Sequence, residues 1–303
     1  MVVLAAGRRG VELFRLNTED YPVRLGLDVD PLRVETARFA GDGFDVPIGR
    51  ARGIWLRRPR WPEITPEVHD PLDRLFARQE AVAAVGGLWR LLADRCVSPA
   101  DALQAARWKL AQLAVARAVG FLVPSSLVTT DASAARSFVA AQPTILKAVG
   151  QAAVALGDEE RVGHTVELDP SVEAASVRPT PVLLQERIAK RADLRVTVVG
   201  QRVFAVRVRT PPDAPLDFRI THPDDCAYEV VDVGPVFESR LHAYLAHWPL
   251  RFGAFDFAEA ADGSPWFLEC NPGGQWGWIE RATGVGITDA LVDLLLDPIA
   301  VHA

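Results

Sequence analysis

The residues with the clearest chemical meaning lie in the segment 252–280, which reads FGAFDFAEAADGSPWFLECNPGGQWGWIE. The Asp-Gly pair at 262–263 is typical of a two-residue hairpin turn. With that turn, Asp256 pairs directly with Glu269 on the returning strand. Residues two apart on a strand share a face of the sheet, so Asn271 lies on the same side as both carboxylates.

Two carboxylates and an amide oxygen, with no His or Cys among them, form a donor set suited to a hard cation such as Mg²⁺. Asp256, Glu269 and Asn271 are therefore our predicted metal ligands. The alternative is a solvated strand face with two exposed acids. The opposite face of the hairpin is expected to be apolar and packed, and it is formed by Phe255, Phe257, Leu268 and Cys270.

Two lysines are candidates for contacts with an anion. Lys147 ends the apolar segment 144–147 and needs a negative partner there, either a carboxylate in a buried ion pair or a phosphate. Lys109 follows Trp108 on an expected helix, where taken alone it is an ordinary solvated residue.

Arginines gather on a second expected hairpin, which joins residues 194–199 to residues 202–209. Arg195 lies on the first strand, and Arg207 and Arg209 share a face of the second. Three guanidinium groups on one ribbon favour contact with a polyanion or with a developing negative charge. An ordinary solvent-facing side of the ribbon is the alternative.

The elements that must position these groups follow from hydrophobic periodicity, caps and turn signals. We expect strands at residues 11–16, 54–57, 126–129, 144–149, 182–188, 194–199, 202–209, 252–258 and 265–271. We expect helices at residues 71–92 and 98–119, and a third that begins at Asp131. Ser98 is the expected cap of the second helix and the start of a compact α+β unit.

Composition narrows the class of protein. The 303 residues are 49% hydrophobic and 24% charged, which is ordinary globular composition, and their net charge of −6 argues against sequence-independent nucleic-acid binding. Three cysteines without a CxxC pair argue against a disulfide scaffold or a cysteine-based zinc site. No apolar run approaches the roughly 20 residues that span a bilayer, and the first residues lack the pattern of a secretory signal. We therefore expect a cytoplasmic protein with no membrane or nucleic-acid partner.

Taken in order along the chain, these features resemble the ATP-grasp ligases: a lysine at a strand end, a Gln-Glu strand, an Asp-x-Arg, and an Asp followed later by Glu-x-Asn. More narrowly, FLECNPGGQW at 267–276 resembles the ATP-grasp maturases of ribosomally made peptides, the microviridin-type or graspetide ligases. Asp217-Phe218-Arg219 resembles the Asp-Trp-Arg of that family. The similar region runs from about Ser98 to the C-terminus.

The resemblance implies a mixed α/β (α+β) chain with the ATP-grasp fold. It implies a pre-ATP-grasp N-terminal domain at residues 1–97, a central lid at residues 98–184, and a C-terminal domain with the metal site at residues 185–303. ATP would be held between the last two domains. One departure concerns residues 148–153, AVGQAA, where many ATP-grasp enzymes carry a glycine-rich loop over the phosphates.

The resemblance also implies a role for each candidate residue. Contacts with the nucleotide fall to two lysines, a hinge strand beside the adenine and a ribose contact, namely Lys109, Lys147, Gln185, Glu186, Arg187, Ile188 and Asp193. The positions that face the phosphates or an acyl phosphate are Arg195 and Arg207. The magnesium ligands of the family match Asp256, Glu269 and Asn271.

The implied activity is an ATP- and Mg²⁺-dependent ligation that activates Asp or Glu side chains of a precursor peptide and joins them to Ser, Thr or Lys side chains. The implied partner is a ribosomal precursor peptide with a leader, and the resemblance leaves a homodimer open. One alternative is a ligase that adds a free amino acid to a protein or small acceptor. The other is a non-catalytic ATP- or peptide-binding module, to which the glycine-poor segment after Lys147 would point.

Overall fold

The computed structural model describes residues 1–41, 43–150, 153–156, 159–162, 165–168, 179–211, 213–216 and 221–297. The segment Asp217-Phe218-Arg219, which contributed to the resemblance, lies outside these residues. Part of the segment 148–153 lies outside them as well.

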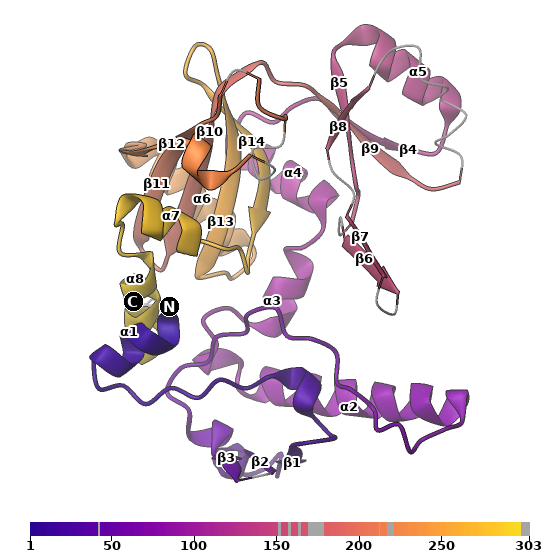
Figure 1. Ribbon diagram of the computed structural model, residues 1–303, viewed down its shortest axis with the longest axis vertical. Helices are drawn as coiled ribbons and strands as arrows, with labels where there is room; N and C mark the ends of the chain where they lie inside the picture. Colours follow the sequence, from indigo (N-terminus) through magenta and orange to yellow (C-terminus); the bar gives the residue numbers. More distant parts are fainter. Residues whose placement is uncertain are drawn as a thin grey trace.

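The N-terminal part builds a small antiparallel sheet beside one long helix (Figure 1). Its elements are α1 (Val2–Arg8), β1 (Gly26–Asp28), β2 (Arg38–Gly41), β3 (Phe44–Val46) and α2 (Pro71–Leu91). The core between sheet and helix is centred on Phe39, Leu88 and Trp89, all of which are buried. Helix α1 leaves this part and packs on α8 (Ile287–Leu296), the last helix of the described chain (Figure 1).

The N-terminal part differs from expectation in two ways. Residues 11–16 form no strand, and the strand expected at 54–57 is reduced to a single bridge between Ile54 and Cys96. The helix expected at 71–92 is confirmed, with the Asp70 carboxylate accepting from the free amides of its first turn. Its apolar residues Leu72, Leu75 and Phe76 are exposed rather than packed.

A second sheet forms the lid-like unit at the upper right of Figure 1. Its strands run in the order β4-β9-β5-β8, each antiparallel to its neighbour. The elements are β4 (Ser126–Thr129), α5 (Ala132–Ala141), β5 (Thr144–Lys147), β8 (Val166–Leu168) and β9 (Val182–Glu186), with a separate hairpin of β6 (Ala153–Leu156) and β7 (Glu159–Val162). The helix expected to begin at Asp131 does so, because the Asp131 carboxylate accepts from two amides of α5.

The largest sheet lies in the C-terminal part and has the order β12-β11-β10-β13-β14. Its strands are β10 (Lys190–Val199), β11 (Arg202–Arg209), β12 (Ala227–Val231), β13 (Phe252–Ala260) and β14 (Pro265–Asn271). Its helices are α3 (Ala100–Ala105), α4 (Lys109–Ala118), α6 (Pro235–His247), α7 (Gly277–Thr283) and α8 (Ile287–Leu296). Short 3₁₀ helices complete the described chain at Thr18–Asp20, Val34–Thr36, Ile48–Arg50, Ala93–Arg95 and Pro223–Asp225.

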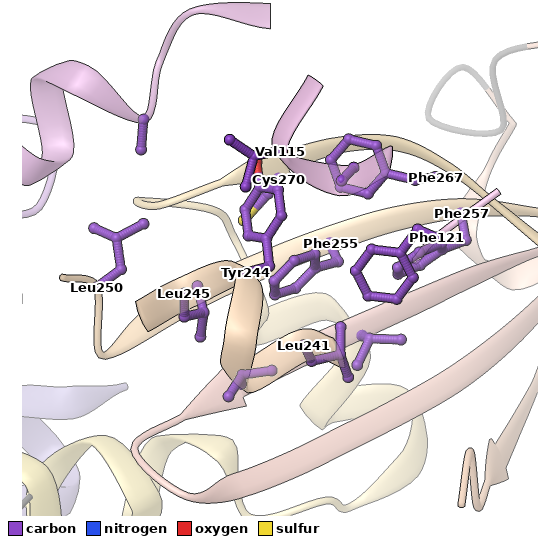
Figure 2. Close-up of a cluster of buried hydrophobic side chains, with 14 of the residues drawn as sticks. Val115, Phe121, Leu241, Tyr244, Leu245, Leu250, Phe255, Phe257, Phe267 and Cys270 are labelled. Carbon is purple, nitrogen blue, oxygen red and sulfur yellow. The ribbon is translucent and has the colours of Figure 1, made fainter. Parts of the chain in front are cut away.

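One face of this sheet is sealed by an aromatic core (Figure 2). Tyr244 of α6 packs against Phe255 and Phe267 with ring centroids 5.2 and 5.4 Å away, and Phe121 stacks on Phe267 at 6.1 Å. The opposite face is covered only in part, where α7, α8 and Trp276 pack on the ends of the strands. The remainder of that face is left for polar groups.

The helix expected at 98–119 is divided in two by a turn, and this turn matters for the site. Helix α3 ends at Ala105 and α4 begins at Lys109. Ser98 does not cap the first of them; its hydroxyl instead accepts from the backbone amide of Arg251. The break places Lys109 in the first turn of a new helix.

Two features of the structure bear on the predicted domain boundaries at residues 97 and 184. Strand β9 belongs to the lid sheet and runs across the boundary at residue 184. Helices α3 and α4 pack into the core of the C-terminal sheet rather than against the lid sheet. Among the described residues, no helix combines the length and hydrophobicity needed to cross a membrane.

Candidate functional site

Asp256 and Glu269 pair as predicted, but the turn and the register that bring them together differ from the prediction. Asp256 pairs with Glu269, but the turn contains three residues, because Ala260 and not Ala261 is bonded to Ser264. Gly263, at φ +88°, closes this turn. A bulge at Leu268 restores the register that the longer turn had shifted.

The longer turn also changes which residues form the apolar face of the hairpin. Phe267, not Leu268, pairs with Phe257 and enters the aromatic core, where it is fully buried (Figure 2). Without the extra residue, Glu269 would lie opposite Phe255 and point to the core. The bulge therefore turns Glu269 to the side of Asp256.

Arg195 completes the centre of this polar face. Strand β10 pairs Arg195 with Asp256, and the guanidinium Nη1 lies 2.5 Å from Asp256 Oδ1. Both side chains are largely buried, with exposed fractions of 9% and 15%. Asp256 lies between Arg195 on β10 and Glu269 on β14, so the ion pair with Arg195 offsets the repulsion between the two facing carboxylates.

The loop after β14 folds back over the same face. Asn271 pairs with Ala254, and its Oδ1 accepts from the Gly273 amide at 3.0 Å. A Cβ on Gly274 would lie 2.4 Å from the Cβ of Ala254, so only glycine allows this approach. Arg195 Nη2 then donates to the Gln275 carbonyl at 3.1 Å and fixes the loop.

The three oxygen-bearing side chains fit a hard cation by donor chemistry and by placement. Asp256, Glu269 and Asn271 lie on one side of one hairpin. Asp256 pairs with Glu269 across the two strands, and Asn271 follows Glu269 by two residues on β14. Within the part of the chain that the structure describes, no three His, Cys, Asp or Glu side chains form a metal cluster. Arg195 Nε is buried without a hydrogen-bond partner among the described atoms.

Arg195 and Arg207, which were expected to face the same phosphates, lie on opposite faces of the sheet. Arg207 pairs with Leu194, which places it on the opposite face of the sheet from Arg195. There its Nε lies 2.6 Å from Glu259 and its Nη1 lies 3.0 Å from Glu229. The hydrogen bond to Glu259 is the main cause of the raised pKa of Arg207. Arg207 is part of an ion-pair network.

The two lysines converge on the end of β5. Lys147 Nζ donates to the side-chain oxygen of Gln185 at 2.8 Å, and Lys109 Nζ donates to the carbonyl of Ala148 at 2.8 Å. Lys109 comes from α4 and Lys147 from the lid sheet, so two distant segments bring amino groups to one place. Two ammonium groups at one strand end favour a polyanion such as a triphosphate.

The predicted hinge residues continue from β9. Gln185 is 1% exposed and its amide donates to the Ser126 hydroxyl, so its side chain is structural as well as a partner of Lys147. Glu186 is tied to Ser125 through both backbone and side chain. Arg187 forms an ion pair with Glu167 at 3.0 Å.

Ile188 follows β9 as half-buried irregular chain, before β10 begins. Asp193, the predicted ribose contact, shares the face of Arg195, but both of its carboxylate oxygens accept from Lys190 Nζ at 2.7 Å. A ribose hydroxyl would share these oxygens with Lys190.

Two groups near the site were not predicted. Gln112 of α4 hydrogen-bonds the backbone of Cys270, between two predicted metal ligands. Arg57 and Arg58 of the N-terminal part contact the loop after β14. Nothing in its local sequence distinguishes Gln112 from a solvated helix residue. The adjacent arginines before Pro59 were a visible signal, but they lie far from the motif in sequence.

Comparison with solved structures gives full-length matches. The macrocyclase MdnB from Microcystis aeruginosa MRC matches with a TM-score of 0.80 at 26% identity, covering 98% of this chain and 94% of that one. MdnC from the same organism, solved with precursor peptide MdnA, matches at 0.83 and 24% identity, covering 98% and 95%. A Chryseobacterium gregarium RiPP-associated ATP-grasp ligase, in complex with ADP and a leader and core peptide, matches at 0.87 and 21%, covering 98% and 92%.

No protein-family model and no curated protein matches the chain. The likeness below 25% identity supports the fold, which is mixed α/β with antiparallel sheets, as expected. The predicted resemblance to peptide-modifying ATP-grasp ligases is confirmed by these neighbours. The similarity extends beyond the region from Ser98 onward, because it includes the N-terminal part.

Proposed function

We propose that this chain, which shares the fold of ATP-grasp macrocyclases along nearly its whole length, is an ATP- and Mg²⁺-dependent peptide ligase. It activates Asp or Glu side chains of a ribosomally made precursor peptide and links them to Ser, Thr or Lys side chains. The observation that carries the proposal is the 98% coverage by macrocyclase structures. Coverage of residues 1–97 argues for a shared substrate class as well as shared nucleotide chemistry.

The reaction consists of two displacements. A carboxylate oxygen of the peptide attacks the γ-phosphorus of ATP, the bond to ADP breaks, and an acyl phosphate forms. A hydroxyl or amine of the same peptide then attacks the acyl carbon and phosphate leaves. The side-chain proton of the nucleophile is released, and one ester or amide bond remains.

The residues supply position and charge for these displacements. Lys109 and Lys147 would hold the phosphates from the lid side, and Arg195 from the sheet. Asp256, Glu269 and Asn271 would hold Mg²⁺, which when bound neutralises charge on the transferred phosphoryl group. Gln185 to Ile188 would meet the adenine, and Asp193 the ribose. Arg207 is left out of this assignment because of its position on the other face.

The proposal includes the cellular setting. ATP and newly made peptides meet in the cytoplasm, so we place the enzyme there. A precursor with a leader is the expected partner, and a homodimer remains a prediction that light scattering in solution would check.

Mass spectrometry of a peptide substrate tests the function. The purified chain is incubated with ATP, Mg²⁺ and a small precursor, rich in Thr, Glu and Asp, encoded beside it. We expect a mass decrease of about 18 Da per link, the mass of one water, together with ADP rather than AMP. A gain of one amino-acid mass would favour the ligase that adds a free amino acid. No mass change and no ADP would favour the binding module.

A further inference from the structure

Two arginines of the N-terminal part lie against the loop that follows β14. Arg58 Nε donates to the carbonyl of Gly273 at 3.2 Å. The guanidinium carbon of Arg57 lies 5.1 Å from the ring centroid of Trp276 and 5.5 Å from that of Trp55. These are cation–π distances, and they hold the guanidinium in place without neutralising it.

The loop beneath these arginines is bonded directly to the candidate site. Gly273 donates its amide to Oδ1 of Asn271, a predicted metal ligand. Two residues further on, the carbonyl of Gln275 accepts from Arg195. Arg57 and Arg58 are therefore one loop away from the groups proposed to hold the metal and the phosphates.

Their charge is uncompensated by the residues that the structure describes. Both side chains are exposed, and neither forms an ion pair with a described carboxylate. Partial burial lowers the pKa of Arg57, and the positive charges of Arg58 and Arg15 lower it further. Arg58 also has a φ of +49°, a strained backbone for a non-glycine residue, and such strain gathers at functional sites.

We propose that Arg57 and Arg58 form an anion subsite that receives a side-chain carboxylate of the peptide substrate, an inference that rests on the proposed function. Guanidinium groups bind planar carboxylates through paired hydrogen bonds. A carboxylate held there lies beside the loop of the metal site and outside the lid. The phosphates already have Lys109, Lys147 and Arg195. Trp276 is buried and Trp55 is half-buried, so both rings serve to hold the Arg57 guanidinium in position.

The test measures binding of a small probe, so it needs no turnover. N-acetylglutamate α-amide carries one peptide-like side-chain carboxylate, and N-acetylglutamine α-amide is its neutral counterpart. Ligand-observed NMR titrates each probe against the full chain with Mg·ADP present. The variants are Arg57→Gln with Arg58→Gln, and the matched control is Arg60→Gln, an exposed arginine in the same segment whose nearest acid is 3.9 Å away.

We expect the acidic probe to bind the unaltered chain and the control, and to bind the double variant at least about tenfold more weakly. The neutral probe should bind none of them well. Equal binding of the acidic probe to the double variant, or equal binding of both probes, would overturn the proposal. Should the double variant unfold, Arg57→Lys with Arg58→Lys retains the charge but loses the paired geometry, and its binding should fall between the two.

Isothermal titration with Mg·ADP separates the two sources of anion. Affinity for Mg·ADP should be unchanged in the double variant, because the subsite is assigned to a carboxylate. A drop in Mg·ADP affinity with no effect on the acidic probe would assign these arginines to nucleotide phosphate and overturn the inference. Failure of the proposed function is scored separately, by the absence of ADP and of peptide dehydration in the unaltered chain.

Discussion

The side chain of Gln112 satisfies both outward-facing backbone groups of Cys270. Its Oε1 accepts from the Cys270 amide at 3.0 Å, and its Nε2 donates to the Cys270 carbonyl at 2.8 Å. Strand β14 is at the edge of its sheet, so these groups have no neighbouring strand among the described residues. Gln112 thus acts as one residue of a missing strand and fixes the backbone between Glu269 and Asn271.

Gln112→Leu should therefore destabilise the chain and make the backbone of β14 around Cys270 more mobile. The change leaves the buried amide and carbonyl of Cys270 without partners, at a cost of about 2–4 kcal/mol in the free energy of unfolding. Urea unfolding gives this value, and hydrogen exchange should show faster exchange at the Cys270 amide. Gln104→Leu, an exposed glutamine on α3, is the control and should change neither. Unaltered exchange at Cys270 would show that β14 holds without Gln112.

Glu269→Gln tests the metal assignment. Replacing a carboxylate by an amide weakens binding of a hard cation, so ADP formation should fall by about a hundredfold or more. The free energy of unfolding should change by less than about 1 kcal/mol, because the side chain keeps its size. Glu238→Gln, on α6 at the other side of the sheet, should have full activity. Turnover of Glu269→Gln at the unaltered rate with excess Mg²⁺ would refute the assignment.

Lys147→Ala tests the nucleotide site. Loss of a half-buried ammonium beside phosphates should weaken Mg·ADP binding by about tenfold to a hundredfold. Calorimetry measures the change, with Arg136→Ala as the control, since Arg136 is an exposed cation on the lid helix α5. Affinity unchanged by Lys147→Ala would leave this lysine as a structural partner of Gln185 alone.

The network around Glu259 predicts a dependence of stability on pH. Glu259 is 2% exposed; burial raises its pKa, but hydrogen bonds from Arg207 and Arg191 outweigh burial and lower it below the ordinary value. A lowered pKa in the folded state means stabilisation that is present above the unfolded-state pKa of about 4.3 and is lost as pH falls through the folded-state pKa.

Glu259→Gln should consequently lower the free energy of unfolding by about 2 kcal/mol at pH 7. The difference from the unaltered chain should shrink as pH falls below about 4.3. Urea unfolding at a series of pH values measures it. A difference that is independent of pH would show that the carboxylate charge contributes nothing.

Local patterns in the sequence determined much of the site. Strand β4, the start of α5 at Asp131 and the turn at Gly200 follow from turn and capping residues that act over a few positions. The pairing of Asp256 with Glu269 was also predicted, although the turn is one residue longer than expected and the bulge at Leu268 restores the register. A prediction from turn chemistry alone was correct only because these two deviations offset each other.

Tertiary structure decided what depends on distant partners. The face of the sheet on which Arg207 lies is set by its pairing with Leu194 of β10, and that face is opposite to the face of Arg195. The three-residue turn places Phe267 in the aromatic core, which is assembled from segments more than a hundred residues apart, and the bulge then returns Glu269 to the side of Asp256. Gln112 reaches Cys270 across 158 residues, and Arg58 reaches Gly273 across 215. Spacing along the sequence does not predict such contacts, because only the folded packing brings the partners together.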